Sequence, residues 1–302
     1  MRVTQSMVSR MSMQQLALQR ARLARTQEQA STGRRLNRPS DDPVDYRSAL
    51  RLTDALSQTG RYLRSIDLSR TRLGATEQAI TDSTEIVSQA KSLAIQARND
   101  TNGPEALANI RIQVEQLFGQ LLTASNTRAA GGGYVFSGVA SETPAFAQSG
   151  SFASGSPPPT VAFAGDDSAI SVEIDEGVMI EVTRSGAQVF QGSVDVFEVL
   201  GRLWQGIDED DAARMDGAIG DLDLALGQLD VERGELGGAG AKADAFEQKL
   251  RGQAQTLTEQ VSVLEDADAY EVYSDLVARE TALQASLQVT ARIQQPTLLD
   301  FL

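Results

Sequence analysis

Seams of mostly apolar residues recur every seven positions through much of the chain, which predicts long helices that pack side by side. Prolines interrupt neither residues 44–103 nor residues 160–295, and a proline inside a helix costs about 3 kcal/mol. We therefore expect one helix over residues 44–98. A helix of this length needs a packing partner, because intrinsic propensity alone does not stabilise it. Its seam consists of Leu52, Thr59, Ile66, Leu73, Ile80, Val87 and Ala94.

Another helix is predicted at the start of the chain, over residues 4–32, with Leu16, Leu23 and Ala30 spaced by seven. Gly33 is expected to end this helix in the left-handed conformation that glycine adopts most easily. The next helix should begin at Pro43, because proline suits the first helical position and side-chain oxygens suit the positions before it. The oxygens are supplied by Asp41 and Asp42.

A second break is predicted near the other end of the chain. The apolar stripe that includes Leu264 stops there, and the next stripe, from Val272 to Leu287, is out of register with it. We place the break at residues 265–270, where Asp266 and Asp268 can cap the helix that follows.

Further helices are expected over residues 105–128 and 196–264, with a loosened stretch at the glycine-rich residues 233–242. Residues 134–195 differ, because apolar and polar residues alternate there around turn residues, as in β-hairpins. The predicted fold is mainly α, with long antiparallel rods or coiled coil built from both chain termini and a small inserted β domain.

Composition removes most catalytic chemistry. The 302 residues include no His and no Cys, which excludes a Ser-His-Asp triad, a thiol nucleophile and a His-ligated zinc ion. The adjacent carboxylates of Asp41 and Asp42 are better explained as helix caps than as an acid–base pair. Residues 165–167 lack the spacing of a calcium loop, and residues 237–242 lack that of a phosphate loop. We predict no enzyme activity, no metal site and no cofactor.

Charge is distributed unevenly along the chain. Residues 1–72 hold 14 Arg and 6 acidic residues, whereas the net charge of the whole chain is -14. A basic arm can bind nucleic acid, but no aromatic residue lies among these arginines before Tyr46, as stacking on single strands would require. A basic-armed helical nucleic-acid-binding protein is kept as an alternative.

We expect no membrane insertion, because no stretch approaches the roughly 20 apolar residues of a membrane span. The first residues lack the apolar core of a secretory signal peptide. Their arginine-rich, acid-poor character also permits a mitochondrial transit peptide.

Two stretches at opposite chain ends carry a family resemblance: QEQASTGRRLNRPSDDPVDYRSAL at residues 27–50 and LEDADAYEVYSDLVARETALQASLQVTARIQQPTLLDFL at residues 264–302. Together they resemble the conserved ends of the bacterial flagellin family. The ending LLDFL and the segment GGGYVFSGVASETPAF at residues 131–146 are similar to the members that form the junction between hook and filament. A short filament flagellin is the alternative within the family.

This resemblance implies a structural protein of the bacterial flagellum that forms a junction ring by assembly of its terminal helices. It implies three domains: residues 1–43 with 265–302 as a terminal coiled coil, residues 44–133 with 196–264 as a helical rod domain, and residues 134–195 as the β insert. It also implies export in an unfolded state through the flagellar type III channel, and an extracellular location at the hook–filament junction.

The same resemblance implies binding partners: further copies of the chain, a neighbouring hook-associated junction protein, flagellin and a cytoplasmic export chaperone. Neither nucleic acid nor a membrane is expected as a partner. Resemblance and seam pattern together predict that the subunit interface contains Leu16, Leu23, Ala30, Ser31, Thr32, Gly33, Leu36, Pro39, Leu276, Leu283, Leu287, Ile293, Leu298 and Leu299.

Overall fold

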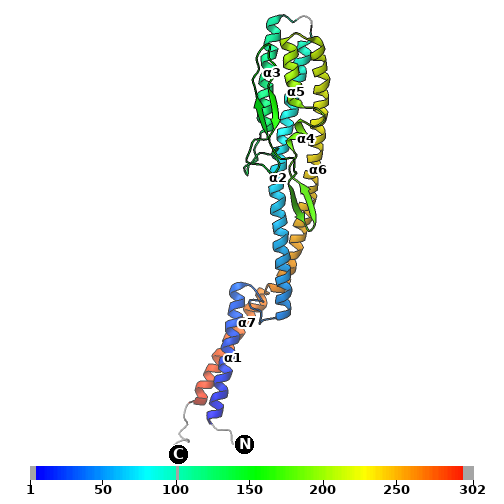
Figure 1. Ribbon diagram of the computed structural model, residues 1–302. Helices are drawn as coiled ribbons and strands as arrows, with labels where there is room; N and C mark the ends of the chain where they lie inside the picture. Colours follow the sequence, from blue (N-terminus) through cyan, green and yellow to red (C-terminus); the bar gives the residue numbers. More distant parts are fainter. Residues whose placement is uncertain (1–4, 100–101, 295–302) are drawn as a thin grey trace, which may run out of the picture. The chain divides into compact units, whose positions relative to one another are not determined.

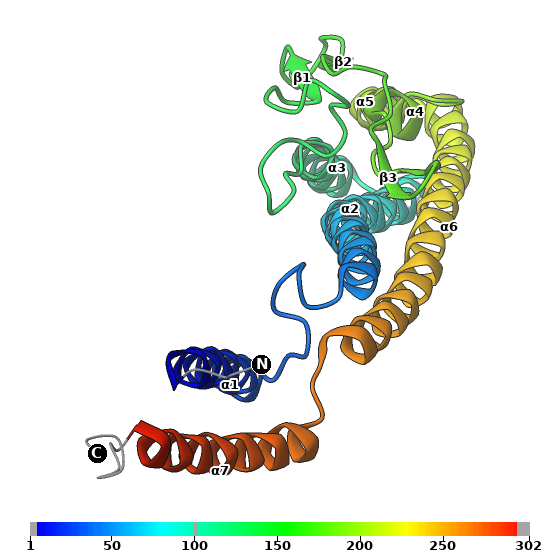
Figure 2. The same ribbon diagram turned by 90° about the horizontal axis from the view of Figure 1, so that it is seen from below.

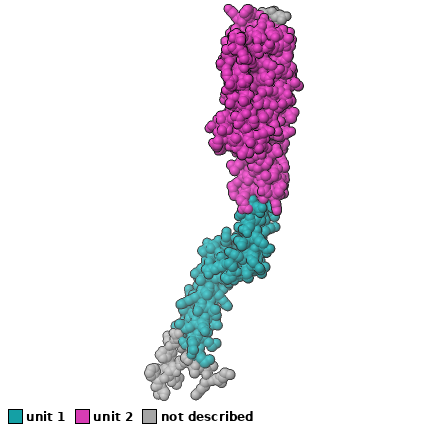
Figure 3. Space-filling view, viewed as in Figure 1, with its two compact units in different colours: residues 1–59, 252–302 teal, residues 60–251 magenta. Residues whose placement is uncertain are grey.

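The fold is mainly α, as predicted (Figure 1). The computed structural model describes residues 5–99 and 102–294, which contain seven helices and four strands. The chain divides into two compact units (Figure 3), which are described separately. We call residues 1–59 with 252–302 the terminal unit, and residues 60–251 the body unit.

Most of the helices lie where the seven-residue pattern predicts them. The first break, after α1, and the second, before α7, are both confirmed. The prediction for residues 105–128 is confirmed except at its end, because the helix stops at Ser125. The bounds are α1 Gln5–Thr32, α2 Pro43–Ala97, α3 Pro104–Ser125, α5 Val196–Asp208, α6 Ala212–Glu265 and α7 Ala269–Gln294.

Two expectations about the C-terminal rod are wrong. The glycine-rich residues 233–242 are not loosened, because α6 runs through them without interruption. Leu236 and Ala243 are buried on either side of the glycines, and this packing holds the helix. The single helix predicted over residues 196–264 is also interrupted. Residues 209–211 separate α5 from α6, and Asp210 there has a positive φ of 52°.

The core of the body unit lies among α2, α3, α5 and α6. Phenylalanine rings connect this core to the segment between α3 and α5. Phe118 of α3 contacts Phe152 and Phe197 edge-on, at ring-centroid distances of 5.0 and 5.8 Å. Aromatic pairs of this geometry stabilise by about 0.5–1.5 kcal/mol beyond the area they bury. The few aromatic residues of the chain are thus concentrated where the inserted segment meets the helices.

The inserted segment forms two separate antiparallel hairpins. One hairpin pairs β1 (Phe146–Ser149) with β2 (Thr160–Phe163). The other pairs β3 (Ser171–Asp175) with β4 (Val178–Glu181), as the alternation of apolar residues predicts. Ile174 and Ile180 of this second hairpin pack with Ile66, Ala243 and Leu250.

The segment also contains a short helix that the sequence pattern did not reveal, α4 (Gly186–Phe190). Ser185 begins it by accepting a hydrogen bond from the backbone N–H of Ala187 at 3.2 Å. The core residues Phe136, Phe146 and Phe190 of the segment share one hydrophobic cluster with α2, α3, α5 and α6. The division of the chain into three domains remains a prediction.

In the part of the chain that the structure describes, no helix has both the length and the apolar character needed to cross a lipid bilayer.

Candidate assembly surface

Within the terminal unit, α1 and α7 lie side by side and antiparallel (Figures 1 and 2). Leu16 and Thr26 of α1 and Thr290 of α7 are buried in this pair. The other seam residues are only half-buried: Leu23, Ala30, Leu276 and Leu283. A pair of helices has one shared face, so each helix keeps most of its surface exposed.

Large apolar side chains remain on those exposed surfaces. On α1, Met7, Met11, Met13 and Leu18 are exposed, Met11 by 62%. On α7, the exposed residues are Tyr270 (85%), Tyr273, Val277 (64%), Leu287 and Val289. Exposed apolar side chains that gather on one surface mark an interaction site. The helix pair therefore offers apolar surface to partners outside the chain.

A mostly apolar groove follows this pair of helices. Met11 and Leu16 of α1 lie on one side of it, and Ala285, Val289 and Thr290 of α7 lie on the other. No charged residue lines it. An apolar side chain of a partner can enter the groove without removing a charge from water.

The two breaks between the rods pair with each other. The backbone N–H of Ala267 donates to the carbonyl of Gly33 at 2.9 Å. The N–H of Arg35 donates to the carbonyl of Glu265 at 2.6 Å, so that Arg34 and Asp266 form an antiparallel bridge. These bonds satisfy backbone groups that the ends of α1 and α6 would otherwise leave unpaired.

Arginine side chains strengthen this pairing. The Arg35 guanidinium donates to the carbonyl of Leu264 at 2.8 Å and to Asp45 at 2.7 Å. Arg34 forms an ion pair with Glu265 at 3.2 Å. Part of the basic character of the N-terminal segment is thus neutralised by acidic residues of the same unit.

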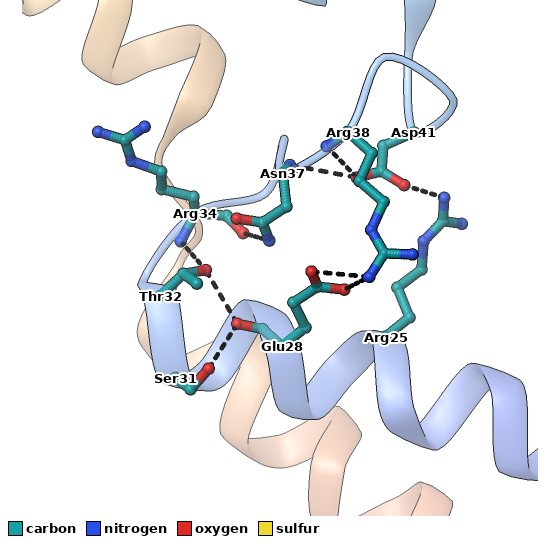
Figure 4. Close-up of polar contacts among 8 residues, drawn as sticks. All are labelled: Arg25, Glu28, Ser31, Thr32, Arg34, Asn37, Arg38 and Asp41. Carbon is teal, nitrogen blue, oxygen red and sulfur yellow. Dashed lines mark hydrogen bonds and ion pairs between the residues drawn. The ribbon is translucent and has the colours of Figure 1, made fainter.

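A polar turn connects α1 to α2 and is drawn in Figure 4. Asp41 accepts hydrogen bonds from the backbone N–H groups of Asn37 (3.1 Å) and Arg38 (3.0 Å), and from the Arg25 side chain. Arg38 in turn donates to both carboxylate oxygens of Glu28 at 3.0 Å. Two ion pairs therefore tie the turn back onto α1.

Hydrogen bonds set the charge state of this turn. Partial burial acts to raise the pKa of Asp41, but the bonds from Arg25, Arg38 and Asn37 together outweigh it and place the pKa below its ordinary value. The pKa of Asp42 is also lowered, by the N–H groups of Asp45 and Val44. Asp42 therefore caps α2, as predicted, whereas Asp41 holds the preceding turn.

The second break is capped in a similar way. Asp268 accepts from the N–H groups of Tyr270 at 2.8 Å and Glu271 at 3.3 Å and so begins α7. Asp266, the other predicted cap, instead accepts from the Ser262 hydroxyl on α6.

The predicted interface residues occupy different environments. Leu16 and Leu36 are buried, whereas Pro39 is exposed and Leu287 is 40% exposed. Leu298, Leu299 and the side chain of Ile293 lie outside the described residues. The rest lie on α1, at its end or on α7: Leu23, Ala30, Leu276 and Leu283 half-buried, and Ser31, Thr32 and Gly33 exposed. Their role in a subunit interface remains a prediction.

Hydroxyl groups at the end of α1 bond within the chain. Ser31 and Thr32 both donate to the carbonyl of Glu28, at 3.0 and 2.9 Å, and Thr32 accepts from the N–H of Arg34 at 3.2 Å (Figure 4). Gly33 has a φ of 68°, which confirms the predicted left-handed end of the helix.

Sequence reasoning missed several exposed apolar residues of the pair, above all Tyr270, Tyr273 and Val277. Their spacing of three and four is the signal that could have revealed a second face on α7. Within residues 5–99 and 102–294, no cluster of acidic side chains has the arrangement needed to hold a metal ion.

Paired helices from both ends of the chain, which expose several large apolar side chains and whose two breaks are hydrogen-bonded to each other, define a helical protein built for assembly. Residues 3–141 match the bacterial flagellin N-terminal helical region, and residues 219–302 match the bacterial flagellin C-terminal helical region. These two regions of one family cover most of the sequence, and the chain belongs to the bacterial flagellin family.

Individual relatives agree with this family. The chain is 24% identical to the flagellar hook-associated protein 3 of Escherichia coli K12, with 97% of each chain covered. It is 23% identical to the protein of that name from Salmonella typhimurium LT2, with 99% of this chain and 98% of the relative covered. The fold resembles that of a flagellar hook-associated protein from Vibrio parahaemolyticus, with a TM-score of 0.66 and 16% identity over 74% of this chain and 99% of that one.

Proposed function

We propose that this chain is a structural protein of the bacterial flagellum that forms the junction ring between hook and filament. One observation carries the assembly part of the proposal: α1 and α7 expose more large apolar residues than they bury between them. The near full-length match to two proteins named flagellar hook-associated protein 3 supports the position in the appendage.

Assembly follows from the weakness of an isolated helix pair. Two helices bury too little apolar surface to offset the conformational entropy lost when they fold. We infer that the described parts of both chain ends, residues 5–40 and 265–294, fold fully only when neighbouring subunits cover the exposed side chains, as for other segments that fold on binding. Contacts between different surfaces of identical chains are heterologous, and they close into a ring when the rotation between subunits permits.

The proposed partners are further copies of this chain, a neighbouring hook-associated junction protein, flagellin and a cytoplasmic export chaperone. The proposed location is extracellular, after export through the flagellar type III channel. The proposal assigns no catalysis, because the chain contains neither His nor Cys and the assembly surface is apolar.

Electron microscopy tests the proposal directly. An antibody against the chain, bound to isolated appendages, should label a single band between hook and filament, and cells lacking the chain should shed their filaments. Label along the whole filament would instead indicate a filament flagellin, which should also polymerise when purified. Complete, attached filaments in cells that lack the chain would refute the proposal.

A further inference from the structure

The outer side of α6 in the body unit carries a second seam that no described part of this chain covers. Positions spaced alternately by three and four from Gly217 to Gln248 are all exposed, and none of them is charged. Leu224 and Val231 lie within this seam and are 58% and 62% exposed. The exposed aspartates Asp216, Asp223 and Asp230 lie beside these positions on α6, so the uncharged strip is narrow. We call these positions the outer seam.

The glycines of the outer seam are not required by packing against other described parts of the chain. Gly220, Gly227 and Gly234 lie seven residues apart, and glycine weakens an exposed helix relative to alanine. None of them has a positive φ. A Cβ added at any of them would meet no atom of the described chain within 4 Å. The small size of these residues therefore leaves the α6 backbone open to close approach from outside the described chain.

A groove with matching properties runs along α2 and α3 of the same unit. It is lined by Gln89, Ser92 and Gln96 of α2 and by Gln113, Gln116 and Gln120 of α3. Leu93 and Leu117 also line it. Figure 2 shows that α2 lies between α3 and α6, so the groove and the outer seam are different surfaces of the body unit. We call it the glutamine groove.

We propose that the outer seam of one copy packs into the glutamine groove of a neighbouring copy; this inference rests on the ring assembly proposed above. The seam lacks bulky side chains at its glycines, so the α6 backbone can approach the groove closely. Leu224 and Val231 supply apolar anchors, and the glutamine amides can donate to backbone carbonyls of α6. Neither the seam positions nor the residues that line the groove are charged, so these positions themselves can be buried without removing a charge from water. Two different surfaces in contact give the heterologous geometry of a ring.

Enlarging the seam tests this packing. In the double variant Gly227→Leu, Gly234→Leu, two bulky side chains block close approach of a partner to α6. A Cβ at either position meets no described atom of its own chain within 4 Å, so the free protein should melt at the same temperature as the parent or higher. Its amount in isolated appendages should fall at least tenfold. Gly74→Leu is the matched control, because Gly74 is also an exposed helical glycine with no neighbour within 4 Å, and it lies outside both surfaces. Incorporation of the double variant at the parent level would overturn the inference.

Cross-linking identifies the occupant of the groove, and the absence of Cys in the chain allows a clean design. Cells that express Val231→Cys, Gln116→Cys together should yield covalent oligomers of the chain after treatment of isolated appendages with a short bis-maleimide. Each single variant should give no oligomer ladder. A product that joins Val231→Cys to flagellin or another protein, or no oligomer ladder from the double variant, would overturn the second copy as occupant. Antibody labelling of appendages tests the junction function independently. Failure of the cross-link would therefore contradict this contact without contradicting the junction function.

Discussion

The carbonyl of Gly33 accepts a hydrogen bond from the backbone N–H of Ala267 at 2.9 Å, which joins the two breaks in the helical rods. Gly33 can offer its carbonyl in this direction because its φ is 68°. The same short segments hold the Arg34–Glu265 ion pair. The left-handed conformation of Gly33 thus helps to set how the first break meets the second, more than 200 residues later in the chain.

Substituting Gly33 should therefore weaken this junction. Gly33→Ala should cost about 1–2 kcal/mol, because a side chain is strained in the left-handed region. Amide exchange of the Ala267 N–H should accelerate accordingly. Gly33→Asn should have a smaller effect, since asparagine tolerates this conformation better. Equal exchange rates in the parent and the alanine variant would show that the backbone conformation does not hold the junction.

Helices α1 and α7 should exchange their amide hydrogens quickly in the free protein and slowly in the appendage. The physical reason is the small area that the pair buries compared with the body core. Hydrogen-exchange mass spectrometry of the purified chain and of isolated appendages measures both states, with α3 as an internal control that stays protected in each. Slow exchange of α1 and α7 in the free protein would show that folding is independent of assembly.

Leu283 is half-buried in the helix pair and is expected to be essential for incorporation. Leu283→Asp should weaken the pairing of α1 and α7 by about 1–3 kcal/mol, because it places a charge in an apolar seam. The body unit should keep its thermal unfolding transition, and the amount of protein in appendages should fall. Gln284→Asp adds the same charge at the exposed neighbouring position and should incorporate normally. Normal incorporation of the Leu283 variant would remove this seam from the interface.

Acidification should loosen the turn that Asp41 holds. Since the folded-state pKa of Asp41 lies below its ordinary value of 3.8, its contribution is present above that value and is lost as pH falls through the lower folded-state pKa. Asp41→Asn should cost about 1 kcal/mol at neutral pH, and should remove this pH dependence. Exchange of the Asn37 and Arg38 N–H groups between pH 2 and 6 checks both effects. The exposed Asp54→Asn variant is the control and should behave as the parent does.

Glu232 is expected to destabilise the body unit at neutral pH. Burial raises the pKa of Glu232 above its ordinary 4.5, which the charge of Arg184 only partly offsets. The folded state therefore binds this proton more tightly than the unfolded state does, and the contribution of Glu232 becomes more favourable as pH falls through the raised pKa.

Replacing this carboxyl by an amide tests that assignment. Glu232→Gln should stabilise the body unit by roughly 1 kcal/mol at pH 7, with a smaller gain at pH 4. Thermal unfolding across this range measures both values. Glu181→Gln removes a different exposed partner of Arg184 and should not stabilise. A less stable Glu232→Gln protein would show that the ion pair with Arg184 outweighs the cost of burial.

Much of the fold could be predicted because its signals are local. The seven-residue seam of α2, the stop at Gly33 and the Asp268 cap each depend on residues within a few positions of one another. The hairpin of β3 and β4 follows from alternation around a short turn. Helix α4 was not predicted, because a five-residue helix has too few positions to show a period.

The assembly surface was predicted only in part. The seam positions Leu16 and Leu283 follow from the period, but periodicity does not show whether a second apolar face is covered. Tyr270 and Val277 could have been core residues of a larger bundle, and only the structure shows that both stay exposed among the described residues.

By itself, the sequence determined where α1, α2 and α7 begin and end, that Asp42 and Asp268 cap helices, and that His and Cys chemistry is absent, because these depend on composition and on neighbours along the chain. Tertiary structure alone decided that residues 33–36 pair with residues 265–267, and that α6 stays helical through its glycines. These outcomes depend on contacts between distant residues, such as the burial of Leu236 and Ala243, whose packing energy exceeds the local preference of glycine for a looser backbone.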